Sequence, residues 1–271
     1  MKSKFKLPAY FVLSITAIAL IGAITTCVDH QTPTSSSDRA IADSHATASL
    51  VSAPITHALL TAGNDPLNTK IYTTAVITPA PNTLITIAIA SHRSTAASAS
   101  PGVTGGGMAA WTEVATITYD PLSLPLKRIS IFRAMSAAPG SGPLTITFPS
   151  TVSNAQWIVS QWDGVEITGT NGSDAIVQTA SNAADVANGL LVSLAQFSHA
   201  NNVAYGVFGA RSSTAVINPG AGFTEIGEQS SAESPNGTLQ AEWAKNIPGI
   251  SASWTNLPGA ALGIEIRARA F

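Results

Sequence analysis

The sequence is poor in cysteine, in charge and in catalytic side-chain patterns. Cys27 is the single cysteine among 271 residues, so no intrachain disulfide stabilises the fold. Charged residues make up only 10% of the chain, and the folded part has no basic cluster, which argues against nucleic-acid binding. The five histidines are scattered without zinc-ligand spacing, and no Gly-x-Ser-x-Gly motif indicates a serine hydrolase.

The N-terminal residues have the pattern of an export signal. Lys2, Lys4 and Lys6 precede an apolar run over residues 7–24, which corresponds to the charged and hydrophobic regions of a leader. The run exceeds the ~7–15 residues usual in such a leader, yet it is shorter than the ~20 of a comfortable membrane span. Removal of the leader takes three lysines from a chain with 13 Lys and Arg against 15 Asp and Glu, and leaves an acidic remainder.

Cys27 follows the apolar run and resembles the acylated cysteine of a bacterial lipoprotein signal. The residue before that cysteine is normally Gly, Ala or Ser, whereas here it is Thr26. Lipidation at Cys27 and a plain cleaved leader both stay open, although a lone thiol is unexpected in an exported chain. We therefore expect a signal over residues 1–27, a Ser/Thr/Ala-rich flexible tether over 28–53 and a β-sandwich domain over 54–271, at the cell envelope or outer surface, or secreted.

Most segments of the folded part alternate apolar and polar residues with period 2. Ile85, Ile87 and Ile89 interleave with Thr86 and Ala88, as expected of strands that bury one face on a core. Further segments of this kind are 144–148, 190–194 and 262–266. Turn signals rich in Pro, Gly and Asn separate them, and no amphipathic helix is evident.

The second half of the chain repeats the first. Three matched pairs of segments show the repeat: Arg93 and Pro101-Gly102 with Arg211 and Pro219-Gly220, Trp111–Val114 with Phe223–Ile226, and Pro143–Phe148 with Gly249–Trp254. The difference in residue number between matched segments decreases only where a loop intervenes, as expected when loops shorten and strands do not. The copies cover about residues 54–166 and 172–271.

Two architectures fit this duplication. The copies either interleave into one two-sheet antiparallel jelly-roll β-sandwich of about 12–14 strands, or fold as two tandem seven-stranded sandwiches. We favour the single jelly roll, because the copies join through residues 163–174 without a long linker and jelly rolls contain two Greek keys.

Several short segments occur in the order found in a known kind of module. These segments are Asn82–Ile87, Arg128–Ala134, Gly142–Phe148, Trp162–Val165, Gly220–Thr224 and Gly263–Ala268. Together they resemble a widespread bacterial secreted or cell-surface β-sandwich module over residues 54–271. The resemblance implies a lectin-like jelly roll of unassigned function, and it brings no catalytic residues.

The repeat sorts the tryptophans into expected core and surface residues. Three of them match large apolar residues of the other copy and are expected in the core: Trp111 with Phe223, Trp243 with Ile131 and Trp254 with Phe148. In the segment 157–162, Ile158 and Ser160 match inward-pointing isoleucines of the second copy. By alternation Trp157 and Gln161 point outward, while Trp162 lies at the edge of the core.

The stretch Trp157–Glu166 is therefore the candidate ligand-binding site. An exposed Trp157 would supply a stacking surface for a glycan, and Gln161, Asp163 and Glu166 would supply planar hydrogen-bonding groups. The competing interpretation is that Trp157 packs beneath a loop or against the tether.

The same stretch resembles the Glu-x-Asp-x-x-Glu signature of laminarinase-type glycosidases. In those enzymes the first Glu is the nucleophile and the last the general acid. Here Gln161 takes the nucleophile position, and an amide cannot form the covalent glycosyl intermediate. The resemblance therefore disfavours a retaining glycosidase, and we expect no catalytic residues.

Oxygen-bearing side chains follow in the next turn. Asp163, Glu166, Asn171 and Asp174 are of the type that calcium prefers, but Asn, Asp and Gly are also the usual turn formers. The stronger expectation is no metal and no cofactor.

These observations predict an exported, non-catalytic surface module that binds a cell-surface or extracellular glycan. One alternative is a structural or adhesive subunit that self-associates through its edge strands. A polysaccharide-cleaving enzyme is the third possibility, because jelly rolls also host such enzymes.

Overall fold

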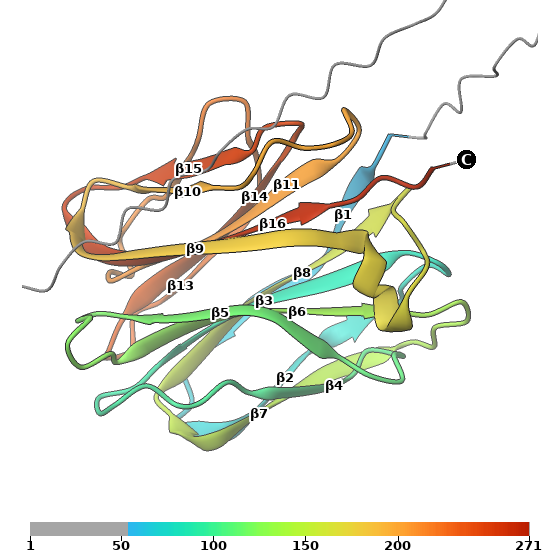
Figure 1. Ribbon diagram of the computed structural model, residues 1–271. Coiled ribbons are helices and arrows are strands. Elements are labelled where there is room, and N and C mark those ends of the chain that lie inside the picture. Colours follow the sequence, from blue (N-terminus) through green and yellow to red (C-terminus); the bar gives the residue numbers. More distant parts are fainter. Residues whose placement is uncertain (1–53, 271) are drawn as a thin grey trace, which may run out of the picture. The chain divides into compact units, whose positions relative to one another are not determined.

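The computed structural model describes residues 54–270, which form two similar halves (Figure 1). The first half contains β1 (Thr56–Asp65), β2 (Thr69–Ile77), β3 (Leu84–His92), β4 (Gly102–Gly105), β5 (Thr112–Tyr119), β6 (Lys127–Met135), β7 (Gly142–Val152) and β8 (Asn154–Asp163). A short 3-10 helix, η1 (Thr170–Ala175), leads into the second half. That half contains β9 (Ile176–Ala187), β10 (Leu190–Ser193), β11 (Val203–Ala210), β12 (Asn218–Pro219), β13 (Thr224–Ser231), β14 (Gly237–Lys245), β15 (Gly249–Ser253) and β16 (Leu257–Ile266).

Each half is an antiparallel sandwich of a five-stranded and a three-stranded sheet. In the first half the strand orders are β1-β8-β3-β6-β5 and β2-β7-β4; in the second they are β9-β16-β11-β14-β13 and β10-β15-β12. The two halves thus have the same topology, strand for strand. Consecutive strands mostly alternate between the two sheets of a half, as in a jelly roll whose fifth strand has joined the larger sheet.

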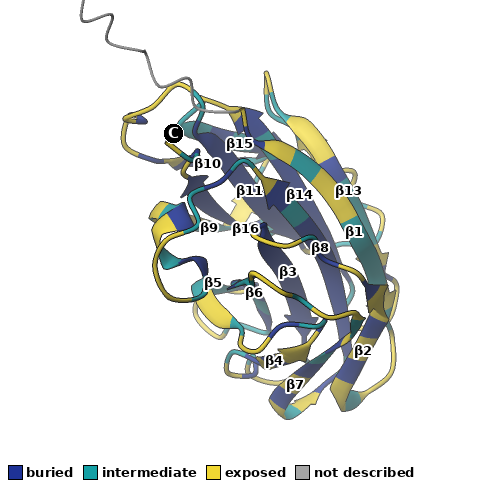
Figure 2. Ribbon diagram, turned by 90° about the vertical axis from the view of Figure 1, so that its right-hand side faces the viewer, coloured by how far each residue is buried: buried dark blue, intermediate teal, exposed yellow. Residues whose placement is uncertain are grey.

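The four sheets stack as four layers, with the five-stranded sheets in the middle (Figure 1). The strand sequences reflect this position. In β7, which belongs to an outer sheet, Leu144, Ile146 and Phe148 are buried and the residues between them are more exposed. Every residue of β3 and of β11 is buried, because both faces of a central sheet are covered. Figure 2 shows these strands as the most uniformly buried part of the molecule.

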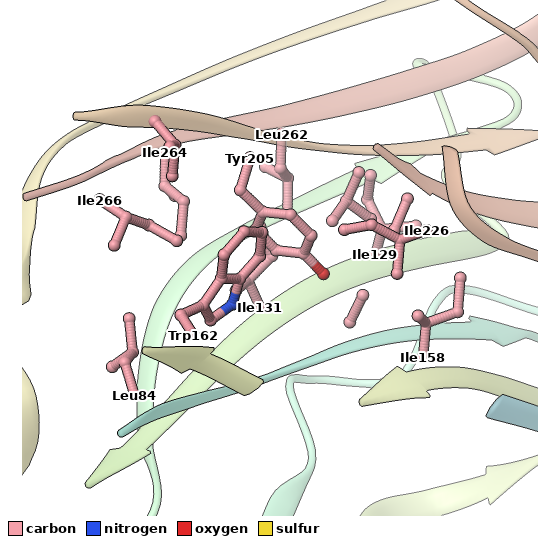
Figure 3. Close-up of a cluster of buried hydrophobic side chains, with 14 of the residues drawn as sticks. Leu84, Ile129, Ile131, Ile158, Trp162, Tyr205, Ile226, Leu262, Ile264 and Ile266 are labelled. Carbon is pink, nitrogen blue, oxygen red and sulfur yellow. The ribbon is translucent and has the colours of Figure 1, made fainter. Parts of the chain in front are cut away.

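Three hydrophobic cores fill the spaces between the layers. The central core lies between the two five-stranded sheets and includes Trp162 of β8 and Tyr205 of β11 (Figure 3). Their ring centroids are 5.3 Å apart, and the Trp162 indole N–H donates to the Thr86 hydroxyl at 2.9 Å. The other two cores lie between the sheets of each half. The halves therefore share their largest apolar surface, which joins them into one body.

The halves pack against each other through equivalent elements. The edge strand β1 lies beside β13, and its counterpart β9 lies beside β5, the counterpart of β13. Figure 2 shows the first of these pairs on one side of the molecule. Such reciprocal packing is that of an isologous interface, here formed within one chain.

Buried polar side chains of the first half bind the turn between β13 and β14. Three of them donate to main-chain carbonyls of residues 233–237: Lys127 Nζ to Asn236 at 2.6 Å, Gln156 Nε2 to Gly237 at 2.7 Å, and Asn154 Nδ2 to Glu233 and Pro235 at 3.2 Å each. Lys127 also lies 3.5 Å from Asp120 Oδ2, and burial lowers the pKa of Lys127 to about 8. These contacts fix the turn against the first half.

The edge strands of all four sheets are short or irregular. β4 and β10 have four residues each and β12 has two. The pairings of the remaining edge strands, β1, β2, β5, β9 and β13, each contain a register shift. Short and bulged edges are the usual protection against pairing with another chain.

The predicted all-β antiparallel sandwich with an internal repeat is confirmed. The structure has sixteen strands in four sheets within the described residues, where we expected 12–14 strands in two sheets. The difference arises because each copy keeps its own pair of sheets, as in the tandem alternative, while the copies also share a buried face.

Candidate functional site

Trp157 is buried, so the prediction of an exposed stacking surface is wrong. Its side chain is 5% exposed and belongs to the outer core of the first half. It does point away from the central core, as alternation predicted, but the three-stranded sheet β2-β7-β4 covers that face. The indole also lies against Gly63, where a Cβ atom would come within 2.9 Å of Trp157 Cζ2.

Gln161 and Asp163 follow Trp157 on the same face of β8, and they have different surroundings. Gln161 is half-buried, and its Oε1 accepts a hydrogen bond from the Ala80 amide at 2.8 Å. Asp163 is exposed at the end of the strand. Its Oδ1 accepts from the Gly164 amide at 2.7 Å, whereas its Oδ2 has no partner among the described residues.

Asp163 lines a shallow cavity at the junction of the two halves, which we call the junction cavity. Its volume is about 270 Å³, near the lower end of the ~300–1,000 Å³ of ligand pockets. The lining residues are Pro54, Thr56, Asn82, Asp163, Gly164, Val165 and Arg269. Carboxylate, amide, hydroxyl and guanidinium groups thus surround one opening.

Four chain segments build the junction cavity. The chain turns at Gly164, whose φ of +75° favours glycine and where a Cβ would meet the Pro54 carbonyl at 2.8 Å. Val165 then pairs with Ala268, and the Arg269 amide donates to the Gly164 carbonyl at 2.9 Å. Asn82, at the turn before β3, also has a positive φ, of 57°. The cavity is therefore framed by tight turns and paired backbone.

Glu166 lies outside this lining and is held by its own turn. Its Oε1 accepts from the amides of Ile167 and Thr168 and from the Thr168 hydroxyl, at 2.9–3.0 Å. These hydrogen bonds, led by that of the Thr168 amide, lower the pKa of Glu166. A general acid of a glycosidase needs a raised pKa, so this carboxyl is poorly suited to the role that the sequence pattern suggested.

The four oxygen-bearing residues considered for calcium do not form one site. Asn171 Oδ1 accepts from the Met135 amide at 2.9 Å, and its Nδ2 donates to Thr112 and Arg133. Asp174 shares the Thr168 hydroxyl with Glu166, and neither of these two residues lines the cavity to which Asp163 contributes. No group of three or more His, Cys, Asp or Glu side chains within residues 54–270 is arranged to hold a metal ion.

A second carboxyl with a shifted pKa, that of Glu242, lies on the outer side of β14. It is fully buried, with Oε2 3.4 Å from both the Gly220 amide and Gln240 Nε2. Its Oε1 has no partner in the described part of the chain. Burial raises the pKa of Glu242 from 4.5 to about 7. Because folding favours its protonated form, its contribution to stability falls as the pH rises through about 7.

Of the residues predicted as a site, only Asp163 lies in the junction cavity. Thr56, Asn82 and Arg269 were missed, since they come from distant parts of the sequence and only the fold brings them to Asp163. The Pro79–Asn82 turn signal was visible in the sequence, but nothing there linked it to the end of β8.

The expectations about export fall on residues that the structure does not describe. The signal, the tether and Cys27 all lie within residues 1–53. In the described range, no helix has the length and apolar character needed to cross a membrane. Comparisons with protein-family models, with curated proteins and with solved structures each found no match.

Proposed function

We propose that the chain is an exported, non-catalytic surface module that binds a saccharide in the junction cavity. The observation that carries the proposal is Asp163, whose Oδ2 has no partner within residues 54–270 and which lines a preformed polar opening together with Asn82. This opening lies where the repeat is interrupted between the two copies.

The groups around the cavity suit neighbouring hydroxyls of a sugar ring. A carboxylate accepts two hydrogen bonds, and the amide of Asn82 both donates and accepts. The Thr56 hydroxyl adds a third polar group on the adjacent strand, opposite Asp163 in the β1–β8 pairing. With about 270 Å³, the cavity would take the end or one unit of a saccharide rather than enclose a long chain.

The edge strands favour this role over that of a self-assembling subunit. Strand pairing between copies needs a regular edge with free main-chain groups. Every edge strand in the described residues is short or contains a register shift. The side-chain chemistry likewise favours binding over cleavage, because Gln161 is an amide and the pKa of Glu166 is lowered.

The test is a glycan array probed with residues 54–271, followed by calorimetry on the saccharides that bind. Asp163→Ala should weaken binding about 10- to 100-fold, as expected for hydrogen bonds to a charged group. Asn82→Gly keeps the positive φ and removes the amide, and it should weaken binding about 3- to 10-fold. Asp185→Asn is the matched control, since the amide oxygen can still accept from Leu122.

Three results would contradict the proposal. The first is binding that both junction-cavity variants leave intact. The second is concentration-dependent growth into filaments, which would favour the structural subunit. The third is reducing sugar released from a polysaccharide and lost on Glu166→Gln, which would favour the enzyme.

A further inference from the structure

A second and larger opening lies at the other end of β1, between the two halves. We call it the inter-half groove; its volume is about 480 Å³. Its lining residues are Asn64, Pro66, Ser213, Thr214, Ser230, Ser231, Ala232 and Glu233. Four hydroxyls, one amide and one carboxylate thus surround the groove, and none of its lining residues is Lys, Arg or His.

The internal repeat identifies this groove as the place where the two halves differ. Here residues at the end of β1 and in the β13–β14 turn line the groove. The equivalent elements on the other side are the end of β9 and the β5–β6 turn. There the Leu122 amide donates to Asp185 Oδ1 at 2.6 Å, so the two walls touch. The same scaffold is closed at one junction and open at the other.

Both walls of the groove are fixed by hydrogen bonds outside it. On the first-half side, Asp65 Oδ1 accepts from the Leu67 amide at 2.8 Å, and the Tyr72 hydroxyl donates to the Leu67 carbonyl at 2.6 Å. On the second-half side, Asn154 Nδ2 donates to the Glu233 carbonyl. The groove is thus preformed, which lowers the entropic cost of binding.

Two polar groups in the groove lack partners among the residues that the structure describes. Ser231 is 2% exposed, and its buried hydroxyl has no hydrogen-bond partner in the structure. A buried polar group without a partner costs free energy that a ligand or water would recover. The exposed Glu233 carboxylate makes no hydrogen bond or ion pair within the described residues, while the main chain of Glu233 is held in place.

We propose that the inter-half groove is a second binding site, which takes a saccharide carrying a protonated amino group. The hydroxyls and Asn64 would bind the hydroxyls of the sugar, and Glu233 would bind the ammonium group. The absence of a cation from the lining disfavours phosphorylated, sulfated and uronic-acid ligands. The site is independent of the junction cavity, because the two lie at opposite ends of β1.

Glucosamine oligomers are the probe, with fully N-acetylated oligomers of the same length as the uncharged comparison. In a titration of residues 54–271 at pH 6 followed by amide chemical shifts, the glucosamine oligomer should shift residues 64–66, 213–214 and 230–233. Glu233→Gln should weaken binding about 2- to 5-fold, and added salt should remove that difference. Ser231→Ala should weaken binding about 2- to 10-fold.

The location of the chemical shifts separates this site from the junction cavity. Asp185→Asn, which alters neither opening, should leave the glucosamine-induced shifts of the groove residues unchanged, and a failure of the junction cavity on the glycan array has no bearing on the groove. The proposal is overturned if the glucosamine oligomer produces no shifts in the groove, or if the N-acetylated oligomer binds there equally well. Thermal unfolding of Ser231→Ala and Glu233→Gln checks that both variants are folded, and the shift map of the unmodified chain needs neither variant.

Discussion

Trp157→Ala distinguishes a core tryptophan from a ligand platform. At 5% exposure, the indole buries about 150–250 Å², which corresponds to roughly 4–6 kcal/mol at about 25 cal/mol per Å² as an upper bound. Truncation of large aromatic core residues costs about 3–5 kcal/mol. We therefore expect Trp157→Ala to lower the free energy of unfolding by about 3–5 kcal/mol.

Trp157→Phe refines this prediction. The Trp157 indole N–H has no hydrogen-bond partner in the described structure, so phenylalanine keeps most of the packing and removes an unsatisfied donor. We expect a change within about 1.5 kcal/mol. Gly63→Ala should be destabilising beside Trp157 and much less so in the Trp157→Ala background, because its Cβ collides with the indole.

The assay is urea unfolding of residues 54–271, monitored by far-ultraviolet circular dichroism. Saccharide binding of the folded Trp157→Phe variant is measured beside it and should be unchanged. A Trp157→Ala variant with an unaltered unfolding midpoint and abolished binding would refute the structural assignment and restore the surface role.

Four further predictions concern charge, assembly and export. The free energy of unfolding should fall between about pH 4.5 and 7 through Glu242, and Glu242→Gln should reduce this fall by roughly 1–3 kcal/mol; the same pH dependence in both proteins, measured by urea unfolding, would contradict it. Lys127→Met leaves Asp120 paired only with the exposed Arg211 and removes the donor to the Asn236 carbonyl, so it should cost about 1–3 kcal/mol, against less than about 1 kcal/mol for the exposed control Lys70→Met. Sedimentation of residues 54–271 should show a monomer at all concentrations, because the edge strands of the sheets are short or contain register shifts. Mass spectrometry of the mature N-terminus decides between the two interpretations of the leader: an acylated Cys27 at the start of the membrane-extracted chain would establish lipidation, and a chain starting elsewhere would exclude it.

Most of the fold could be predicted from the alternation of apolar and polar residues and from the internal repeat. Alternation in segments such as Leu144–Phe148 identifies strands because it reflects local burial, which the sequence encodes directly. Alternation also placed Trp157 and Ile158 on opposite faces of β8. It could not show that both faces are covered, because that depends on a second sheet packing from another part of the chain.

The repeat predicted equivalent cores but was less reliable for single residues. Trp254 and Phe148 are both buried at matching places, as expected. Trp243, however, lies opposite Thr224 as Arg133 lies opposite Thr112, so its structural counterpart is Arg133 and not Ile131. The bulges in β5 and β13 fall within these hairpins, and only the paired backbone reveals the register.

The candidate sites were mostly beyond the reach of the sequence. Asp163 was found because it belongs to the unmatched stretch Trp157–Glu166 between the copies. Asn82 and Arg269 reach it only through the turn before β3 and the pairing of Val165 with Ala268. The inter-half groove was not predictable because it reflects a difference between two equivalent places in the fold, where β1 meets the β13–β14 turn and where β9 meets the β5–β6 turn. Short sequence motifs do not show which elements meet.

The most direct test of the account is a crystal structure of residues 54–271 with a saccharide selected on the glycan array. The account predicts the sugar in the junction cavity, with its hydroxyls bound to Asp163 Oδ2 and to the Asn82 amide. A saccharide bound instead on the outer face of β2-β7-β4 or of β10-β15-β12, with the junction cavity empty, would contradict it.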